Sequence, residues 1–70
     1  MILVFKTNVA DTSEMETLQP LLDKHLKNAK WNFDLEDCDK ILRIDCQTEI
    51  SSIAIKLLEQ NGFMCEELPD

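Results

Sequence analysis

Apolar residues alternate with polar ones, or recur every three to four positions, in successive stretches of this chain. Residues 2–9 are rich in β-branched and aromatic side chains and have apolar residues on both faces, which predicts a central strand ending near Asn8. A helix is predicted next, because an apolar stripe recurs at helical spacing. The stripe consists of Met15, Leu18, Leu22, Leu26 and Ala29.

Two capping frames precede this stripe, Asp11-x-x-Glu14 and Ser13-x-x-Glu16, and either could start the helix. Pro20 lies inside the stripe, where it removes one backbone donor and should bend the helix without ending it. The helix is therefore predicted to end near Asn28. His25 flanks the stripe and is expected to be a surface or half-buried helix residue.

A strand hairpin is predicted after the first helix. Trp31, Phe33 and Leu35 alternate with polar neighbours, and the polar turn at residues 36–40 follows them. A second alternating stretch, residues 41–46, then completes an antiparallel pair of strands.

A second helix and a last strand are predicted in the remaining residues. Thr48 is expected to cap the helix, whose apolar stripe is Ile50, Ile53, Ala54 and Leu57. Asn61-Gly62 is typical of a left-handed helix stop, with Phe63 packing back on the last turn. Residues 63–68 are predicted to form the final strand.

The order strand, helix, strand, strand, helix, strand predicts an α+β, ferredoxin-like βαββαβ sandwich. In this fold a four-stranded antiparallel sheet carries two helices on one face, and the other face is open to solvent or to a partner. The 70 residues fit a single domain, 1–70.

The net charge of the chain disfavours some classes of binding partner. The chain has fourteen acidic and seven basic residues, and its net charge of −7 would repel DNA, RNA and anionic membranes. Lys24, Lys27 and Lys30 recur every three residues and are expected to line one helix face. This face is either a solvated helix end, where cations suit the helix dipole, or a small docking patch for an acidic protein.

The cysteines indicate a reducing environment. Cys38, Cys46 and Cys65 are odd in number and widely spaced, with no Cys-x-x-Cys, so free thiols and a cytoplasmic setting are expected. The apolar run at residues 1–5 is too short for a signal-peptide core or a membrane span. Cys46 and Cys65 fall on the apolar positions of their predicted strands and should pack as small hydrophobic residues, whereas Cys38 should be exposed.

Five segments together resemble the heavy-metal-associated domain family, which includes small copper chaperones and the N-terminal modules of metal-pumping ATPases. They are Phe5-Lys6-Thr7-Asn8-Val9, Leu21-Leu22-Asp23-Lys24, Trp31-Asn32-Phe33-Asp34-Leu35, Lys40-Ile41-Leu42 and Asn61-Gly62-Phe63. The family carries Cys-x-x-Cys where the first strand meets the first helix, so that two thiolates converge on Cu(I) or Zn(II). Asp11 and Glu14 occupy those positions here. The resemblance therefore implies a degenerate member without the metal motif.

Two functions follow as expectations. The first is a non-enzymatic protein-interaction module that meets a partner with a basic surface, or a second copy, through one end of the fold. Its candidate contact residues are Asp11, Thr12, Glu14, Cys38 and Phe63. The carboxylates of Asp11, Glu14, Glu36, Asp37 and Asp39, crowded toward that end, would favour a basic partner.

The alternative is a metal-binding or metal-sensing protein that uses Asp11 and Glu14 together with Cys38. Two carboxylates fall well short of the roughly six to eight oxygens that calcium prefers. An enzyme such as a small ferredoxin-like acylphosphatase needs a positive phosphate cradle, but Arg43 is the only arginine and no glycine-rich loop occurs. No catalytic residue and no cofactor are predicted.

Overall fold

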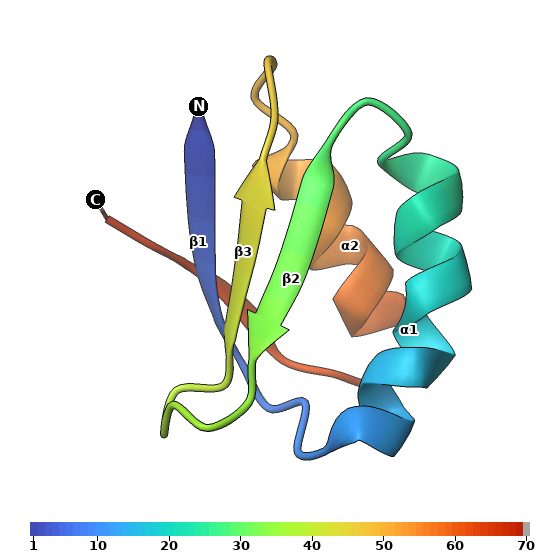
Figure 1. The fold of residues 1–70 in the computed structure, drawn as a ribbon, viewed down its shortest axis with the longest axis vertical. Coiled ribbons are helices and arrows are strands. Elements are labelled where there is room, and N and C mark those ends of the chain that lie inside the picture. Colours follow the sequence, from blue (N-terminus) through green and yellow to red (C-terminus); the bar gives the residue numbers. More distant parts are fainter. Residues whose placement is uncertain (70) are drawn as a thin grey trace.

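Six elements follow one another in the computed structural model, which describes residues 1–69. They are strand β1 (Ile2–Thr7), helix α1 (Thr12–His25), strand β2 (Lys30–Asp34), strand β3 (Ile41–Asp45), helix α2 (Ser51–Gln60) and strand β4 (Cys65–Leu68). The strands form one antiparallel sheet in the order β2-β3-β1-β4, and both helices cover the same face of it (Figure 1). The predicted ferredoxin-like βαββαβ fold is confirmed.

Strand β1 lies at the centre of the sheet, as its apolar content on both faces predicts. Leu3 is paired with Ile44 of β3 and Phe5 with Leu42, so the inward side chains of the two strands stand side by side. The strand ends at Thr7, next to the predicted end near Asn8, and Val9 is fully buried in the loop that follows. The final strand begins at Cys65 and not at residue 63, because a turn follows α2.

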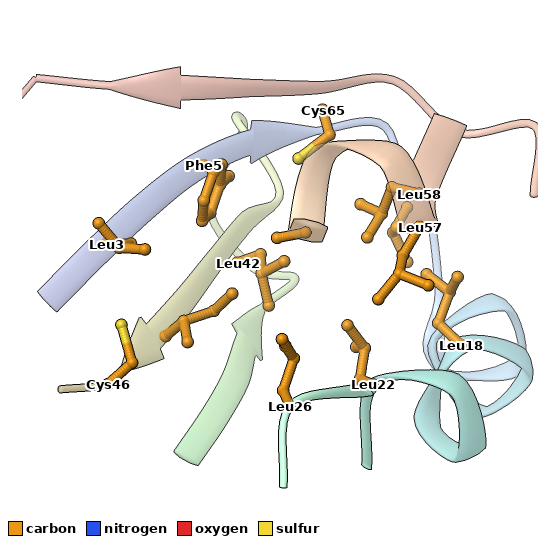
Figure 2. Packing of buried hydrophobic residues seen from close by; sticks show 13 residues of the cluster. Leu3, Phe5, Leu18, Leu22, Leu26, Leu42, Cys46, Leu57, Leu58 and Cys65 are labelled. Atoms are coloured by element: carbon orange, nitrogen blue, oxygen red, sulfur yellow. The ribbon is translucent and has the colours of Figure 1, made fainter. Parts of the chain in front are cut away.

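Apolar side chains from the sheet and from both helices fill the space between them (Figure 2). The largest fully buried ones are Phe5, Val9, Leu18, Leu22, Leu42, Ile44 and Leu58. Burying a side chain of this size stabilises the fold by roughly 1.5–3 kcal/mol relative to its exposed form. On β2, Trp31 and Phe33 are half-buried on the same face and pack against the margin of this core.

Helix α1 begins at the first of the two predicted frames. The backbone N–H of Glu14 donates to Oδ1 of Asp11 at 2.9 Å, and the N–H of Ala10 donates to Oε1 of Glu14 at 2.7 Å. The helix passes through Pro20 as predicted but ends at His25, before Asn28. Leu26 leaves helical geometry, with φ −119° and ψ 49°, yet remains in the core.

Helix α2 differs from its prediction at two points. Thr48 does not cap it: the N-cap is Ile50, which makes no side-chain cap bond, and Glu49 accepts a hydrogen bond from the Ser51 N–H at 2.8 Å. Ile53 is 43% exposed, whereas Leu58 is fully buried, so the buried face is rotated away from the predicted stripe.

The end of α2 forms as predicted. Gly62 has φ +86°, a conformation that side chains other than glycine adopt only at a cost, and its N–H donates to the carbonyl of Glu59 at 3.1 Å. The N–H of Phe63 donates to the carbonyl of Leu58 at 2.9 Å. This pair of bonds is a Schellman motif, and it turns the chain toward β4.

Candidate functional site

The β1–α1 loop and the β2–β3 turn are joined at one end of the sheet by Thr7. The backbone N–H of Thr7 donates to the carbonyl of Asp39 at 3.1 Å, and its hydroxyl donates to the carbonyl of Lys40. The same hydroxyl oxygen accepts a bond from the Val9 N–H at 3.3 Å. Thr7 is buried and its bond to Lys40 is partly buried, so these bonds are partly shielded from water and hold the two loops in a fixed relation.

The segment between α2 and β4 meets the same end of the fold. Oδ1 of Asn8 accepts a hydrogen bond from the N–H of Met64 at 2.7 Å, across 56 positions of sequence. Phe63 is half-buried and packs against the core next to this contact. The first loop, the turn around Cys38 and the region of Phe63 therefore lie together, as the topology predicts.

Five carboxylates lie on these loops and in the first turn of α1, and we call this group the acidic end. It consists of Asp11, Glu14, Glu36, Asp37 and Asp39. Two cations lie among them, and both are engaged: Nζ of Lys6 lies 3.7 Å from Oδ1 of Asp39, and Nζ of Lys40 donates to the carbonyl of Leu35 at 2.8 Å. The Lys6–Asp39 pair is solvent-exposed and contributes little to stability.

Asp11 and Glu14 act on the backbone. Oδ1 of Asp11 accepts the Glu14 N–H, one of the groups that a helix start leaves without a partner, and Oε1 of Glu14 accepts the N–H of Ala10, the residue before the cap. Hard carboxylate oxygens committed in this way are a poor donor set for a soft ion such as Cu(I). Thr12, between them, is exposed.

Cys38 is exposed in the β2–β3 turn, and its thiol lies near two other carboxylates. Among residues 1–69, one set of three potential metal donors comes together, with Asp37, Cys38 and Asp39 each offering an atom within 4.8 Å of the others. Oδ1 of Asp37 also accepts the Asp39 N–H at 2.8 Å, which shapes the turn. Asp11 and Glu14 are not part of this set. In the sequence this set appears as the consecutive residues Asp37-Cys38-Asp39. Sequence motifs for metal sites use ligands that are separated by other residues, so they do not detect three consecutive ligands.

The other two cysteines are buried, as their apolar phase predicts. Cys46 lies at the opposite end of the sheet, where its carbonyl accepts a bond from the amino group of Met1 at 2.6 Å. Cys65 is paired with Thr7 in the β1–β4 ladder and points into the core (Figure 2). Burial, with a smaller effect from the nearby charge of Glu59, raises the pKa of the Cys65 thiol from 9.0 to about 12. The thiolate that a soft metal requires is therefore disfavoured at this residue.

Basic side chains lie at the end opposite the acidic end. Because α1 stops at His25, Lys24 lies on the helix, Lys27 on the following loop and Lys30 on β2, so the prediction of one helix face is wrong. A cavity of about 290 Å³ lies between residues 24–29 and the β3–α2 loop, and no carboxylate of residues 1–69 lines it. His25 is exposed there.

No helix in the described part of the chain combines the length and the apolar character that crossing a membrane requires. Comparison with protein-family models, with curated proteins and with solved structures gives no match for this chain.

Proposed function

We propose that this chain is a small non-enzymatic module of the heavy-metal-associated type that works by protein contact and not by carrying a metal ion. In this proposal Asp11 and Glu14 stand where the family has its two thiols, and the acidic end docks on a basic surface of a partner protein. Thr12, Cys38 and Phe63 belong to the same contact surface. The ferredoxin-like fold and the five segments of sequence resemblance support the family part of the proposal.

The observation that carries the contact role is the convergence of three separate loops on one carboxylate-rich end. Their mutual hydrogen bonds, Thr7 to Lys40 and Met64 to Asn8 among them, hold the acidic end in shape before any partner arrives. A preformed surface loses less conformational entropy on binding than a flexible one. Clustered charge of one sign also raises the rate of encounter with an oppositely charged partner.

The test is capture of partners by the purified chain and by an isosteric double variant, Asp11→Asn with Glu14→Gln. Both amide side chains keep the oxygens that accept the capping bonds, so the variant should fold while losing two negative charges. A Glu66→Gln, Glu67→Gln variant removes the same charge from β4 and is the matched control. A protein recovered with the wild type and control but lost with the loop variant, in a salt-dependent manner, should then bind as a purified pair.

The proposal is contradicted if purified partners bind equally to the wild type and to the loop variant. It is also contradicted if the shifts of backbone NMR signals on binding fall at the Lys24–Lys27 end and not at the acidic end. Both measurements use the intact, folded chain, so they do not depend on identifying a family.

A second candidate is favoured by the triplet Asp37, Cys38 and Asp39, whose donor atoms lie within 4.8 Å of one another. A divalent ion could be held there, with Asp11 and Glu14 as neighbouring charge. Titration of the reduced chain with Cu(I), Zn(II), Ni(II) and Mn(II) against a competing chelator tests it, with Cys38→Ser and the Asp11→Ala, Glu14→Ala double variant alongside. A dissociation constant weaker than about 10 μM for every ion would remove this candidate.

A further inference from the structure

The two border strands of the sheet, β2 and β4, differ in how well they are protected against pairing with another chain. Figure 1 shows β2 at the margin of the sheet, and within residues 1–69 no strand pairs with its outer side. Strands with a free row of N–H and C=O groups are templates for pairing unless proline, a bulge or an unfavourable charge protects them. This observation is independent of the acidic end and of the function proposed above.

Strand β2 has the sequence Lys30-Trp31-Asn32-Phe33-Asp34, which is nearly symmetric in its chemistry about Asn32. If β2 pairs antiparallel with β2 of a second copy, centred on Asn32, each Lys30 lies opposite Asp34 of the other chain. Each Trp31 then lies opposite the other chain's Phe33. Opposite charges and aromatic pairs that lie directly across two strands stabilise the strand pair.

The geometry points to β2 as a self-association edge. Through it, two copies of this chain join their four-stranded sheets into a single eight-stranded sheet. Residues 30, 32 and 34 share the open face, while residues 31 and 33 share the helix face. The two ion pairs would therefore form on one side of the joined sheet and the aromatic pairs on the other. The partner is a second copy because the charge pattern is complementary to itself in this register.

The side chains on β2 are arranged for such a contact. Trp31 and Phe33 are half-buried, with ring centroids 5.9 Å apart in an edge-to-face arrangement, so each keeps some apolar surface exposed. The indole N–H of Trp31 donates to Oδ1 of Asp23 on α1 at 3.0 Å, which holds the ring in place. An ordered aromatic pair at a free sheet edge loses little side-chain entropy when a partner covers it.

Strand β4 shows what a protected edge looks like in the same molecule. Its sequence Cys65-Glu66-Glu67-Leu68 would bring Glu66 opposite Glu67 of the other chain in antiparallel self-pairing, and Pro69 follows. Like charges placed directly opposite each other destabilise the pair. The chain therefore discriminates between its two edges through charge.

Charge swapping tests the register. In the dimer, Lys30→Glu alone sets two carboxylates opposite each other, and Asp34→Lys alone sets two ammonium groups opposite each other. Each single variant should therefore dimerise about tenfold more weakly than the wild type. An equimolar mixture of the two variants forms two favourable pairs and should recover dimerisation as a heterodimer. Lys27→Glu mixed with Glu59→Lys makes comparable charge reversals away from β2 and should show no such recovery.

Sedimentation equilibrium from about 10 μM to about 1 mM is the measurement, because an interface of five residue pairs is small and should be weak. A wild type that stays monomeric throughout overturns the proposal, as does a dimer that the charge swap leaves unchanged. Lys30 lies opposite Asp45 in the β2–β3 ladder, so the fold of each variant is checked by circular dichroism. If a variant does not fold, an isotope-filtered NMR experiment on mixed labelled and unlabelled wild type decides through the presence or absence of intermolecular Trp31–Phe33 contacts.

Discussion

The hydroxyl group of Thr7 donates a hydrogen bond to the backbone carbonyl of Lys40, and this contact joins the end of β1 to the turn between β2 and β3. Lys40 has φ +48°, in the left-handed region that lysine seldom adopts. Thr7 is buried, so loss of this bond would leave the Lys40 carbonyl without its donor, and the Thr7 hydroxyl would keep only the bond that it accepts from the Val9 N–H. The shape of the acidic end therefore depends on a residue outside it.

We expect Thr7→Val to lower the free energy of unfolding by about 1–3 kcal/mol, because the substitution keeps the shape but leaves the Lys40 carbonyl without its donor. Urea unfolding followed by circular dichroism measures the change. Thr17→Val is the control, since Thr17 makes its hydroxyl bond to Ser13 at an exposed helix position. Equal losses in the two variants would contradict the structural role of the Thr7 bond.

Leu58→Ala should destabilise the fold by about 2–5 kcal/mol, because the side chain is fully buried and its removal leaves a cavity. Ile53→Ala should change stability by less than about 0.5 kcal/mol, since Ile53 is 43% exposed. Thermal or urea unfolding of the two variants gives the comparison. The apolar stripe in the sequence predicts the reverse order, so the pair of measurements separates sequence pattern from packing.

Asp11→Ala should cost about 1 kcal/mol through loss of the helix cap, and Asp11→Asn should restore most of that stability because its amide oxygen can still accept the Glu14 N–H. Thr48→Ala should be close to neutral, because Thr48 does not cap α2. Unfolding midpoints at neutral pH measure all three. A loss at Thr48 equal to that at Asp11 would indicate a helix start different from the one described.

Thiol labelling of the folded chain should modify Cys38 within minutes while Cys46 and Cys65 react only after denaturation. Exposure controls access, and the raised pKa of Cys65 also limits its thiolate. Mass spectrometry after timed addition of a thiol reagent at mildly alkaline pH reads the sites separately. Fast modification of Cys65 in the native chain would contradict its burial.

The raised pKa of the Cys65 thiol makes the stability of the fold depend on pH. The folded pKa of Cys65, about 12, lies above the unfolded value of 9.0, so the unfolded chain loses its proton first. Its contribution to stability is thus complete below pH 9.0 and decreases as the pH rises toward about 12. Unfolding by urea across this range should show a steeper decline for the wild type than for Cys65→Ala, in which that titration is absent.

Hydrophobic periodicity was sufficient to predict the order of the elements and their topology, because each helix and strand buries one continuous face. The topology also predicted that Cys38, Cys65 and the first loop lie at one end of the fold. Thr7 is paired with Cys65 in the β1–β4 ladder, and its N–H donates to the carbonyl of Asp39, next to Cys38. The Gly62 stop, a local signal with a strict geometry, was also predictable, whereas the sequence offered two capping frames for α1 and did not decide for the one at Asp11.

The errors arose where tertiary contacts decide between local alternatives. Residues 53, 54, 57 and 58 of α2 offer two overlapping apolar faces, and the packing of the helix on the sheet buries the one that contains Leu58. Leu26 remains in the core although α1 ends at His25. The helical spacing of apolar residues therefore continues past the end of the helix, and the helix was predicted to be too long. The positive φ of Lys40 has no signal in the sequence, because the Thr7 bond and the hairpin impose it.

The position of β1 between β3 and β4 has a consequence for how the chain folds during synthesis. This strand leaves the ribosome before any of its partners, and its second neighbour, β4, ends only at Leu68. Until then its apolar face has no complete sheet to join, and such delayed, non-local pairing is where nascent chains are exposed to misassembly. Slowing translation between β3 and β4 should therefore prolong the period in which the apolar face of β1 is exposed.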